Sequence, residues 1–85
     1  MLNQVIKLTS KCGFHARPAS MFTKLASTFK SQVTLNYNGK KINGKSIINI
    51  LTLGAACGSE VELVVDGEDE SEALPALSQF LIEME

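Results

Sequence analysis

The sequence has few of the side chains that usually carry catalytic chemistry, and it has no segment long enough to cross a membrane. It holds no tryptophan, one histidine (His15), one arginine (Arg17), two cysteines and two prolines. Two isolated cysteines provide no zinc-binding signature, and in a reducing compartment we expect both to be free thiols. No apolar run approaches the roughly 20 residues that span a bilayer, and MLNQVIKLTS lacks the basic start and long apolar run of a secretory signal. We therefore expect a cytosolic protein with no metal, no cofactor and no membrane insertion.

Size and charge narrow the classes of protein further. A chain of 85 residues is one domain, residues 1–85, with little room for a deep cleft that holds both a substrate and catalytic groups. The formal net charge of −1 argues against a direct nucleic-acid partner. Seven of the eight Lys and Arg residues lie between Lys11 and Lys45, whereas all nine acidic residues lie from Glu60 onward. The sequence therefore favours a binding or carrier module with a locally basic surface over an independent enzyme.

Apolar residues alternate in some segments and follow helical spacing in others, which predicts both strands and helices. The expected elements are a strand at 3–10, a helix at 16–29, a hairpin at 32–43 turning at Asn38-Gly39, a short helix at 46–53, a strand at 60–67 and a helix at 70–85. Their order, βαββαβα, predicts an α+β fold. In that fold helices cover one face of an antiparallel sheet and the other face is solvated.

Pro75 lies inside the last of these helical segments. Proline fits a helix best in its first turn, where the missing N–H has no partner to lose. The sequence therefore leaves two alternatives: either the helix begins near Ser71, or it is bent at Pro75.

The segment KCGFHARPAS, residues 11–20, places His15 and Arg17 at the predicted start of the first helix. The first N–H groups of a helix are unpaired and lie at the positive end of its dipole, so they form an anion site. Arg17 adds a guanidinium group that binds phosphate or carboxylate oxygens. This combination suits a histidine that accepts a phosphoryl group. Two alternatives remain: His15 is an ordinary cap or surface residue, or it forms a nucleophile pair with Cys12.

A second candidate segment is NGKSIINILTLG, residues 43–54. Ser46 lies at a predicted helix N-terminus beside Lys45, which is a favourable place for a phosphate group, although the serine also suits a plain N-cap. The five apolar residues that follow cannot all face inward on so short a helix. Some are expected to be exposed and to form a patch for a partner, and ordinary core packing explains the others. They are Ile47, Ile48, Ile50, Leu51 and Leu53.

Three segments in this order, GFHARPA at 13–19, NGKSIINILTLG at 43–54 and DGEDE at 66–70, resemble HPr, the histidine phosphocarriers of the bacterial phosphoenolpyruvate-dependent sugar phosphotransferase system. The resemblance covers essentially the whole chain. It implies an open-faced β-sandwich with a four-stranded antiparallel sheet of order 1-4-2-3 and three helices on one face. It also implies a carrier rather than an enzyme: His15 accepts a phosphoryl group on Nδ1 from phospho-enzyme I and donates it to sugar-specific IIA domains, and Arg17 stabilises the phosphate.

The same resemblance implies that Ser46 is a regulatory serine. In many members a kinase/phosphorylase modifies it, which weakens transfer and creates a co-repressor for a catabolite-control transcription factor. Two alternatives follow: a regulatory adaptor that acts mainly through phospho-Ser46, or the nitrogen-branch carrier. We expect a monomer. The residues expected to bind partners are Lys24, Lys45, Ile47, Ile48 and Leu51.

The chain also departs from the family pattern. Cys12 stands where a small or amide residue is expected near the site, and its thiol is open to oxidation. Ser27 replaces a basic residue of many relatives, which leaves the expected basic rim to Arg17, Lys24 and Lys45. None of these departures removes His15.

Overall fold

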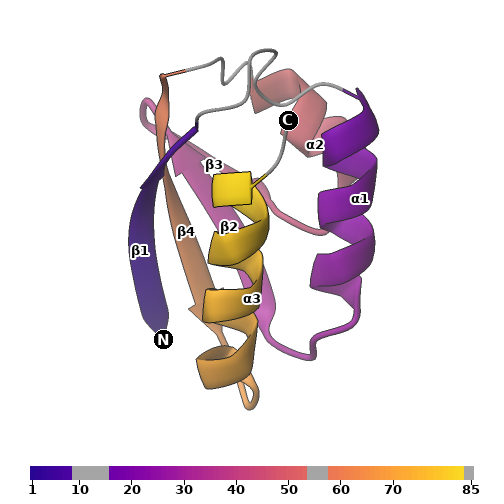
Figure 1. Cartoon of the computed structure of the whole chain (residues 1–85), viewed down its shortest axis with the longest axis vertical. Coiled ribbons are helices and arrows are strands. Elements are labelled where there is room, and N and C mark those ends of the chain that lie inside the picture. Colours follow the sequence, from indigo (N-terminus) through magenta and orange to yellow (C-terminus); the bar gives the residue numbers. More distant parts are fainter. Residues whose placement is uncertain (9–15, 54–57, 84–85) are drawn as a thin grey trace.

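The computed structural model describes residues 1–8, 16–53 and 58–83 (Figure 1). Its elements follow the predicted order βαββαβα: β1 (Leu2–Lys7), α1 (Ala16–Ser27), β2 (Gln32–Tyr37), β3 (Lys40–Asn43), α2 (Ile47–Leu53), β4 (Glu60–Asp66) and α3 (Glu70–Glu83). The predicted boundaries agree within a few residues. The greatest difference is at the first strand, which was expected to reach residue 10 and ends at Lys7.

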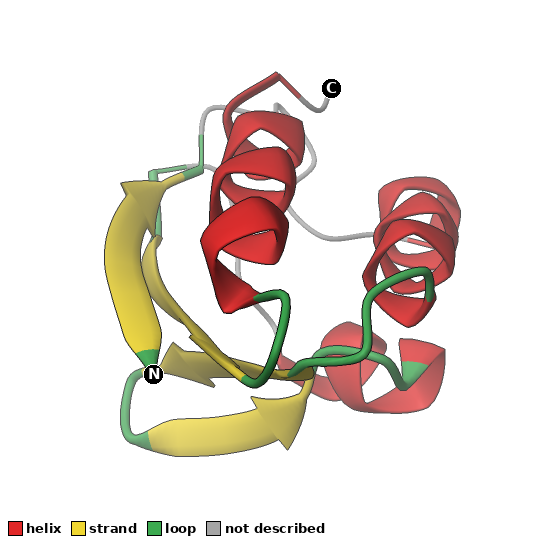
Figure 2. Cartoon of the chain, turned by 90° about the horizontal axis from the view of Figure 1, so that it is seen from below, coloured by secondary structure: helices red, strands yellow, loops and turns green. Residues whose placement is uncertain are grey.

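The four strands form one antiparallel sheet in the order β1-β4-β2-β3, as the family resemblance implied. Strand β4, the sixth element in the chain, lies between β1 and β2. The first and the last strand of the sequence are therefore neighbours in the sheet. Figure 2 shows all three helices on the same side of the twisted sheet, with α1 and α3 side by side. The other side is free of helices among the described residues.

Alternation along the strands explains which side is covered. On β4, Val61, Leu63 and Val65 are completely buried beneath the helices, because successive side chains of a strand point to opposite faces. The helices meet them with Phe22 of α1 and Leu77 of α3, both also fully buried. The uncovered face is polar instead. There Glu62 accepts hydrogen bonds from the side-chain amides of Asn3 and Asn36, at 2.9 and 3.2 Å.

The predicted hairpin turn is confirmed at Asn38-Gly39. Both residues have positive φ angles, 54° and 84°, as a type I′ turn requires. The turn joins β2 to β3 with Tyr37 opposite Lys40. The sequence prediction succeeds here because the conformation depends on two adjacent residues and needs no distant contact.

The structure gives the start of the helix that contains Pro75. Helix α3 begins at Glu70, close to the predicted start at Ser71, and Pro75 is inside the helix. Asp69 is the N-cap position, and its backbone carbonyl accepts a 2.9 Å bond from the N–H of Ala73. Proline has no N–H group, so Pro75 cannot bond the carbonyl of Ser71 four residues earlier. Both residues are exposed, and water can bond that carbonyl instead.

Candidate functional site

The N-terminal end of α1 carries the first candidate site. Helix α1 begins at Ala16, so Arg17 and Pro18 belong to its first turn, as predicted. The side chain of Arg17 is exposed, whereas Pro18 and Ala19 are buried. This turn therefore sits firmly against the core while it presents a guanidinium group to solvent at the positive end of the helix dipole. His15 and Cys12 lie outside the described residues, as does Cys57.

The start of α2 carries the second candidate, Ser46. Its hydroxyl accepts a hydrogen bond of 3.4 Å from the N–H of Asn49, and its carbonyl accepts one of 3.1 Å from Ile50. Ser46 is therefore the N-cap of α2, as the sequence predicted. It is half-buried, and its hydroxyl lies at the end of the helix where an anion is stabilised.

Helix α2 divides its apolar residues between the core and solvent. Ile50 and Leu53 are 0% and 2% exposed and pack into the core. Three others are exposed: Ile47, Ile48 and Leu51, at 36%, 70% and 42%. The expectation that a short helix cannot bury all five is confirmed, and the three exposed residues are those predicted to face a partner. We call Ile47, Ile48 and Leu51 the α2 apolar patch.

Sequence reasoning missed one exposed apolar residue on α1. Met21 is 52% exposed, although its helix buries Phe22 completely. The signal was present in the spacing, because Met21 falls outside the 19, 22, 25, 26, 29 stripe that predicted the buried face of this helix. An apolar residue off that stripe is expected to face solvent.

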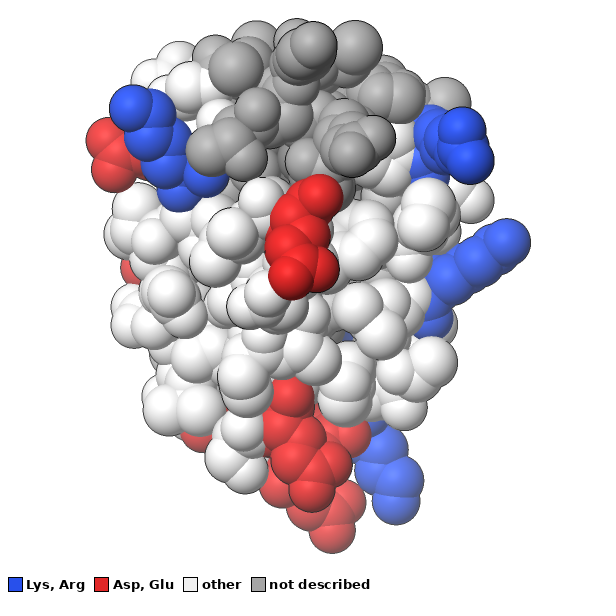
Figure 3. Space-filling view, viewed as in Figure 1, with Lys and Arg blue, Asp and Glu red and all other residues white. Residues whose placement is uncertain are grey.

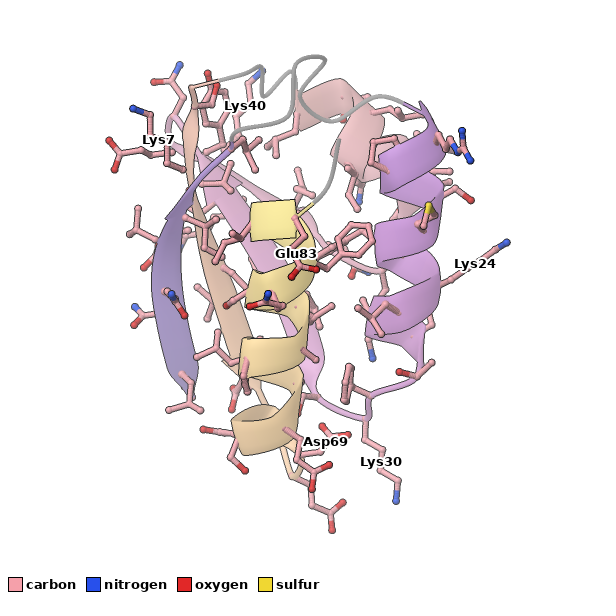
Figure 4. The ribbon with its side chains drawn as sticks, in the orientation of Figure 1. Lys7, Lys24, Lys30, Lys40, Asp69 and Glu83 are labelled. Carbon is pink, nitrogen blue, oxygen red and sulfur yellow. The ribbon has the colours of Figure 1, made fainter. Side chains whose placement is uncertain are left out.

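The three cations expected to form one basic rim do not lie together. Arg17 is in the first turn of α1, and Lys24 is in its last turn, pointing away from the molecule (Figure 4). Arg17 and Lys24 are seven residues apart, which is about 10 Å along the helix axis. The ammonium group of Lys45 instead lies at the C-terminal end of α1, where it donates a 2.8 Å hydrogen bond to the carbonyl of Phe29. The cations are therefore spread along α1.

The charged side chains are unevenly distributed over the surface. Figure 3 shows Lys and Arg side chains along the edge of the molecule that α1 forms and acidic side chains gathered around the N-terminal end of α3, while a further cation lies beside an acidic side chain at the opposite edge. In the described parts of the chain, no group of three or more His, Cys, Asp and Glu residues is arranged to hold a metal ion. Nor does any described helix have the length and apolar character to span a bilayer.

The fold is a four-stranded antiparallel sheet with three helices, and the described part of each candidate site lies at the N-terminal end of a helix. The family model described as the PTS HPr component phosphorylation site matches residues 2–83. The chain belongs to the HPr family, and it is a phosphoryl carrier protein rather than an enzyme. The resemblance that the sequence motifs indicated is confirmed.

Individual relatives agree with this assignment. Phosphocarrier protein HPr of Neisseria meningitidis (serogroup A, serotype 4A) is 46% identical over 81 residues, which are 95% of this chain and 91% of that protein. The crystal structure of HPr from Thermoanaerobacter tengcongensis superposes with a TM-score of 0.92 at 42% identity, covering 95% of this chain and 91% of that one.

A third relative is HPr-like protein Crh of Bacillus subtilis, a catabolite-repression protein, at 42% identity over 98% of each chain. Its crystal structure superposes with a TM-score of 0.78, covering 95% of this chain and 93% of that one, and was described as a domain-swapped, intertwined dimer.

Proposed function

We propose that this HPr-family chain accepts a phosphoryl group on Nδ1 of His15 from phospho-enzyme I and donates it to sugar-specific IIA domains. The observation that carries the proposal is the exposed guanidinium group of Arg17, held in the first turn of α1 two residues after His15. In each transfer the bond between phosphorus and the donor breaks as the bond to the acceptor nitrogen forms. No water takes part, so the phosphoryl group is carried and not hydrolysed.

Arg17 has a direct electrostatic role in this proposal. A phosphoryl group on His15 brings negative charge to the end of α1, where the helix dipole is positive. The guanidinium group can donate two parallel hydrogen bonds to phosphate oxygens. Because Arg17 is exposed, it reaches the group both when the donor delivers it and when the acceptor takes it. Each partner protein then completes the site with its own residues.

The α2 apolar patch is the proposed docking surface. Lys24, which is exposed, and Lys45, which is half-buried, are proposed as further partner-binding residues. Exposed isoleucine and leucine side chains lose contact with water when a partner covers them, which stabilises the complex by about 25 cal/mol per Å² of apolar area. Ile48, at 70% exposure, has the most to bury.

Ser46 is the proposed regulatory residue. Phosphorylation there, by an ATP-dependent kinase/phosphorylase, would put a dianion at the N-cap of α2, directly before Ile47 and Ile48. A charge at this place opposes docking of a partner that must receive or deliver a phosphoryl group. The phosphorylated form would also serve as a co-repressor for a catabolite-control transcription factor.

The similarity to Crh supports a second candidate, a regulatory adaptor that acts mainly through phospho-Ser46. The presence of His15 favours the carrier, since a purely serine-regulated relative does not need a histidine at that position. The nitrogen-branch carrier keeps the chemistry of His15 but has other partners. Transfer from the phosphorylated chain to a sugar IIA domain and to a nitrogen-branch IIA domain, measured side by side, separates these two branches.

Two phosphorylation reactions test the proposal. With phosphoenolpyruvate and enzyme I, the chain should gain one acid-labile phosphate, which His15→Ala abolishes and Ser46→Ala leaves intact. An acid-stable product, or no product, refutes the carrier role. With ATP and the kinase, Ser46 should gain an acid-stable phosphate, and failure to label it refutes the regulatory role alone.

We further propose that the carrier is a cytoplasmic monomer. Light scattering after gel filtration tests this oligomeric state, and a stable dimer of the kind described for Crh would contradict it.

A further inference from the structure

Lys45 makes a contact that neither its place in the sequence nor its charge predicted. Its ammonium group donates a part-buried hydrogen bond of 2.8 Å to the backbone carbonyl of Phe29, sixteen residues earlier. Phe29 lies just past the end of α1, and Lys45 lies just before α2. The lysine side chain therefore joins the end of one helix to the start of the next.

The backbone of Lys45 is fixed as firmly as its side chain. Its N–H donates to the side-chain oxygen of Asn43 at 2.9 Å, and the N–H of Gly44 donates to the carbonyl of Val33 at 2.7 Å. A Cβ atom at Gly44 would lie 2.6 Å from Cγ1 of Val33, so this turn packs directly against β2. The backbone from which the Lys45 side chain extends is therefore held against the sheet.

The other end of the contact is a helix terminus, which favours a cation. The chain leaves α1 in tight turns, with the N–H groups of Thr28 and Phe29 bonded to the carbonyls of Leu25 and Ala26 at 3.0 and 3.2 Å. The carbonyl groups at such an end carry partial negative charge, and lysine side chains bind them from other parts of a fold. A charge-assisted hydrogen bond of this kind is stronger than a neutral one.

We propose that Lys45 is a positioning residue for phosphoryl transfer, acting through the relative placement of α1 and α2. This inference rests on the proposed function, in which partners dock on the α2 apolar patch. Ile47 and Ile48 follow Lys45 by two and three residues, and Lys24, in the last turn of α1, precedes the contact at Phe29 by five residues. The Lys45–Phe29 contact therefore sets how the docking residues of the two helices face a partner. One of the three donors of the Lys45 ammonium group is thereby engaged within the fold.

Matched lysine variants separate this role from a docking charge. Lys45→Met removes the ammonium group and keeps the length of an unbranched side chain, whereas Lys45→Arg keeps a donor. Lys24→Met is the control, because the side chain of Lys24 is exposed and points away from the molecule. The readouts are the melting temperature, and the KM and kcat of transfer from phospho-enzyme I at roughly 50 to 300 mM salt, a range over which exposed charges become screened.

The expected results differ for the two sites. Lys45→Met should lower the melting temperature by about 5 °C or more. It should also raise KM by a factor between about two and ten at every salt concentration, with kcat unchanged. Lys45→Arg should recover most of both losses. Lys24→Met should leave the melting temperature unchanged and flatten the dependence of KM on salt, as removal of an exposed docking charge does.

Two results would overturn the proposal. If Lys45→Met kept the wild-type melting temperature and flattened the salt dependence as Lys24→Met does, Lys45 would be a docking charge. If it lowered the melting temperature but left KM unchanged, Lys45 would be structural and would not position the docking surface. Failure of the wild-type chain to accept a phosphoryl group would instead refute the proposed function, and the positioning role would fall with it.

Discussion

The carboxylate of Asp69 accepts hydrogen bonds from both the backbone N–H and the hydroxyl of Ser31, thirty-eight residues earlier in the chain. Its second oxygen accepts a 2.8 Å bond from the N–H of Lys30. Asp69 immediately precedes α3, and Ser31 immediately precedes β2, so one side chain joins the two loops at the same end of the molecule. Ser31 is 1% exposed, and Asp69 satisfies its polar groups there.

This contact predicts a particular dependence of stability on pH. The hydroxyl of Ser31 and the N–H groups of Lys30 and Ser31 lower the pKa of Asp69 from its ordinary value of 3.8 to about 2. Because the pKa is lower in the folded state, these bonds contribute full stability above pH 3.8 and lose it as the pH falls toward 2. Asp69→Asn should therefore be less stable than wild type at neutral pH, and the difference should shrink on acidification.

Urea unfolding at a series of pH values measures the effect of Asp69→Asn. Glu68→Gln is the control, because Glu68 is exposed and adjacent to Asp69 in sequence. Asp69→Asn will still lose some stability as the pH falls, because the N-terminal ammonium group lowers the pKa of Glu70 as well. A difference in stability between wild type and Asp69→Asn that stays constant from neutral pH to pH 2 would contradict the assignment.

Gly67→Ala should be strongly destabilising. A Cβ atom at Gly67 would lie 2.6 Å from Cα and 2.9 Å from Cβ of Ser31, and neither atom can move without shifting backbone. We expect a loss of about 2 kcal/mol or more in the free energy of unfolding. Gly58→Ala is the comparison: its φ of 87° is also positive, but nothing lies within 4 Å of the added atom. That variant should lose about 1 kcal/mol, and equal losses would show that the contact with Ser31 is unimportant.

Arg17→Ala should slow phosphoryl transfer while leaving the fold intact. The side chain is exposed, so its removal should change the free energy of unfolding by less than about 0.5 kcal/mol. Loss of a charge-assisted contact to the transferred group should lower kcat/KM by about 10- to 100-fold. Transfer is measured from phospho-enzyme I, with Lys7→Ala as the matched removal of an exposed cation on β1, away from α1. A wild-type rate for Arg17→Ala would eliminate Arg17 from the site.

Ile48→Ala should weaken partner docking without affecting stability. Ile48 is 70% exposed on α2, so truncation should change the free energy of unfolding by less than about 0.5 kcal/mol. It should raise the KM for transfer by a factor between about three and thirty, since a partner would no longer bury the side chain. Val5→Ala is the control, because Val5 is 59% exposed on the uncovered face of the sheet. Equal effects of the two variants on KM would mean that α2 is not the docking surface.

Much of this protein follows from local patterns in its sequence. Alternation placed Val61, Leu63 and Val65 on one face of a strand, and Asn38-Gly39 supplied the positive φ angles of the turn. Ser46 was predicted as a cap and is one. These features depend on neighbouring residues, so no knowledge of the rest of the fold was needed. The motifs at 13–19 and 43–54 were specific enough to indicate the family as well.

The sequence by itself determined the elements, the buried faces of the strands and the family, because each depends on the spacing of residues along a few turns or a single strand. Only the tertiary structure decided where long side chains end. Lys45 was expected in a basic rim with Arg17, yet its ammonium group lies on the carbonyl of Phe29. The carboxylate of Asp69 likewise binds a residue far away in the sequence, because it accepts a hydrogen bond from the N–H of Ser31. A lysine or an aspartate has several rotamers of similar energy, and the partner it takes is set by which distant backbone groups the packed helices and strands bring within hydrogen-bonding distance.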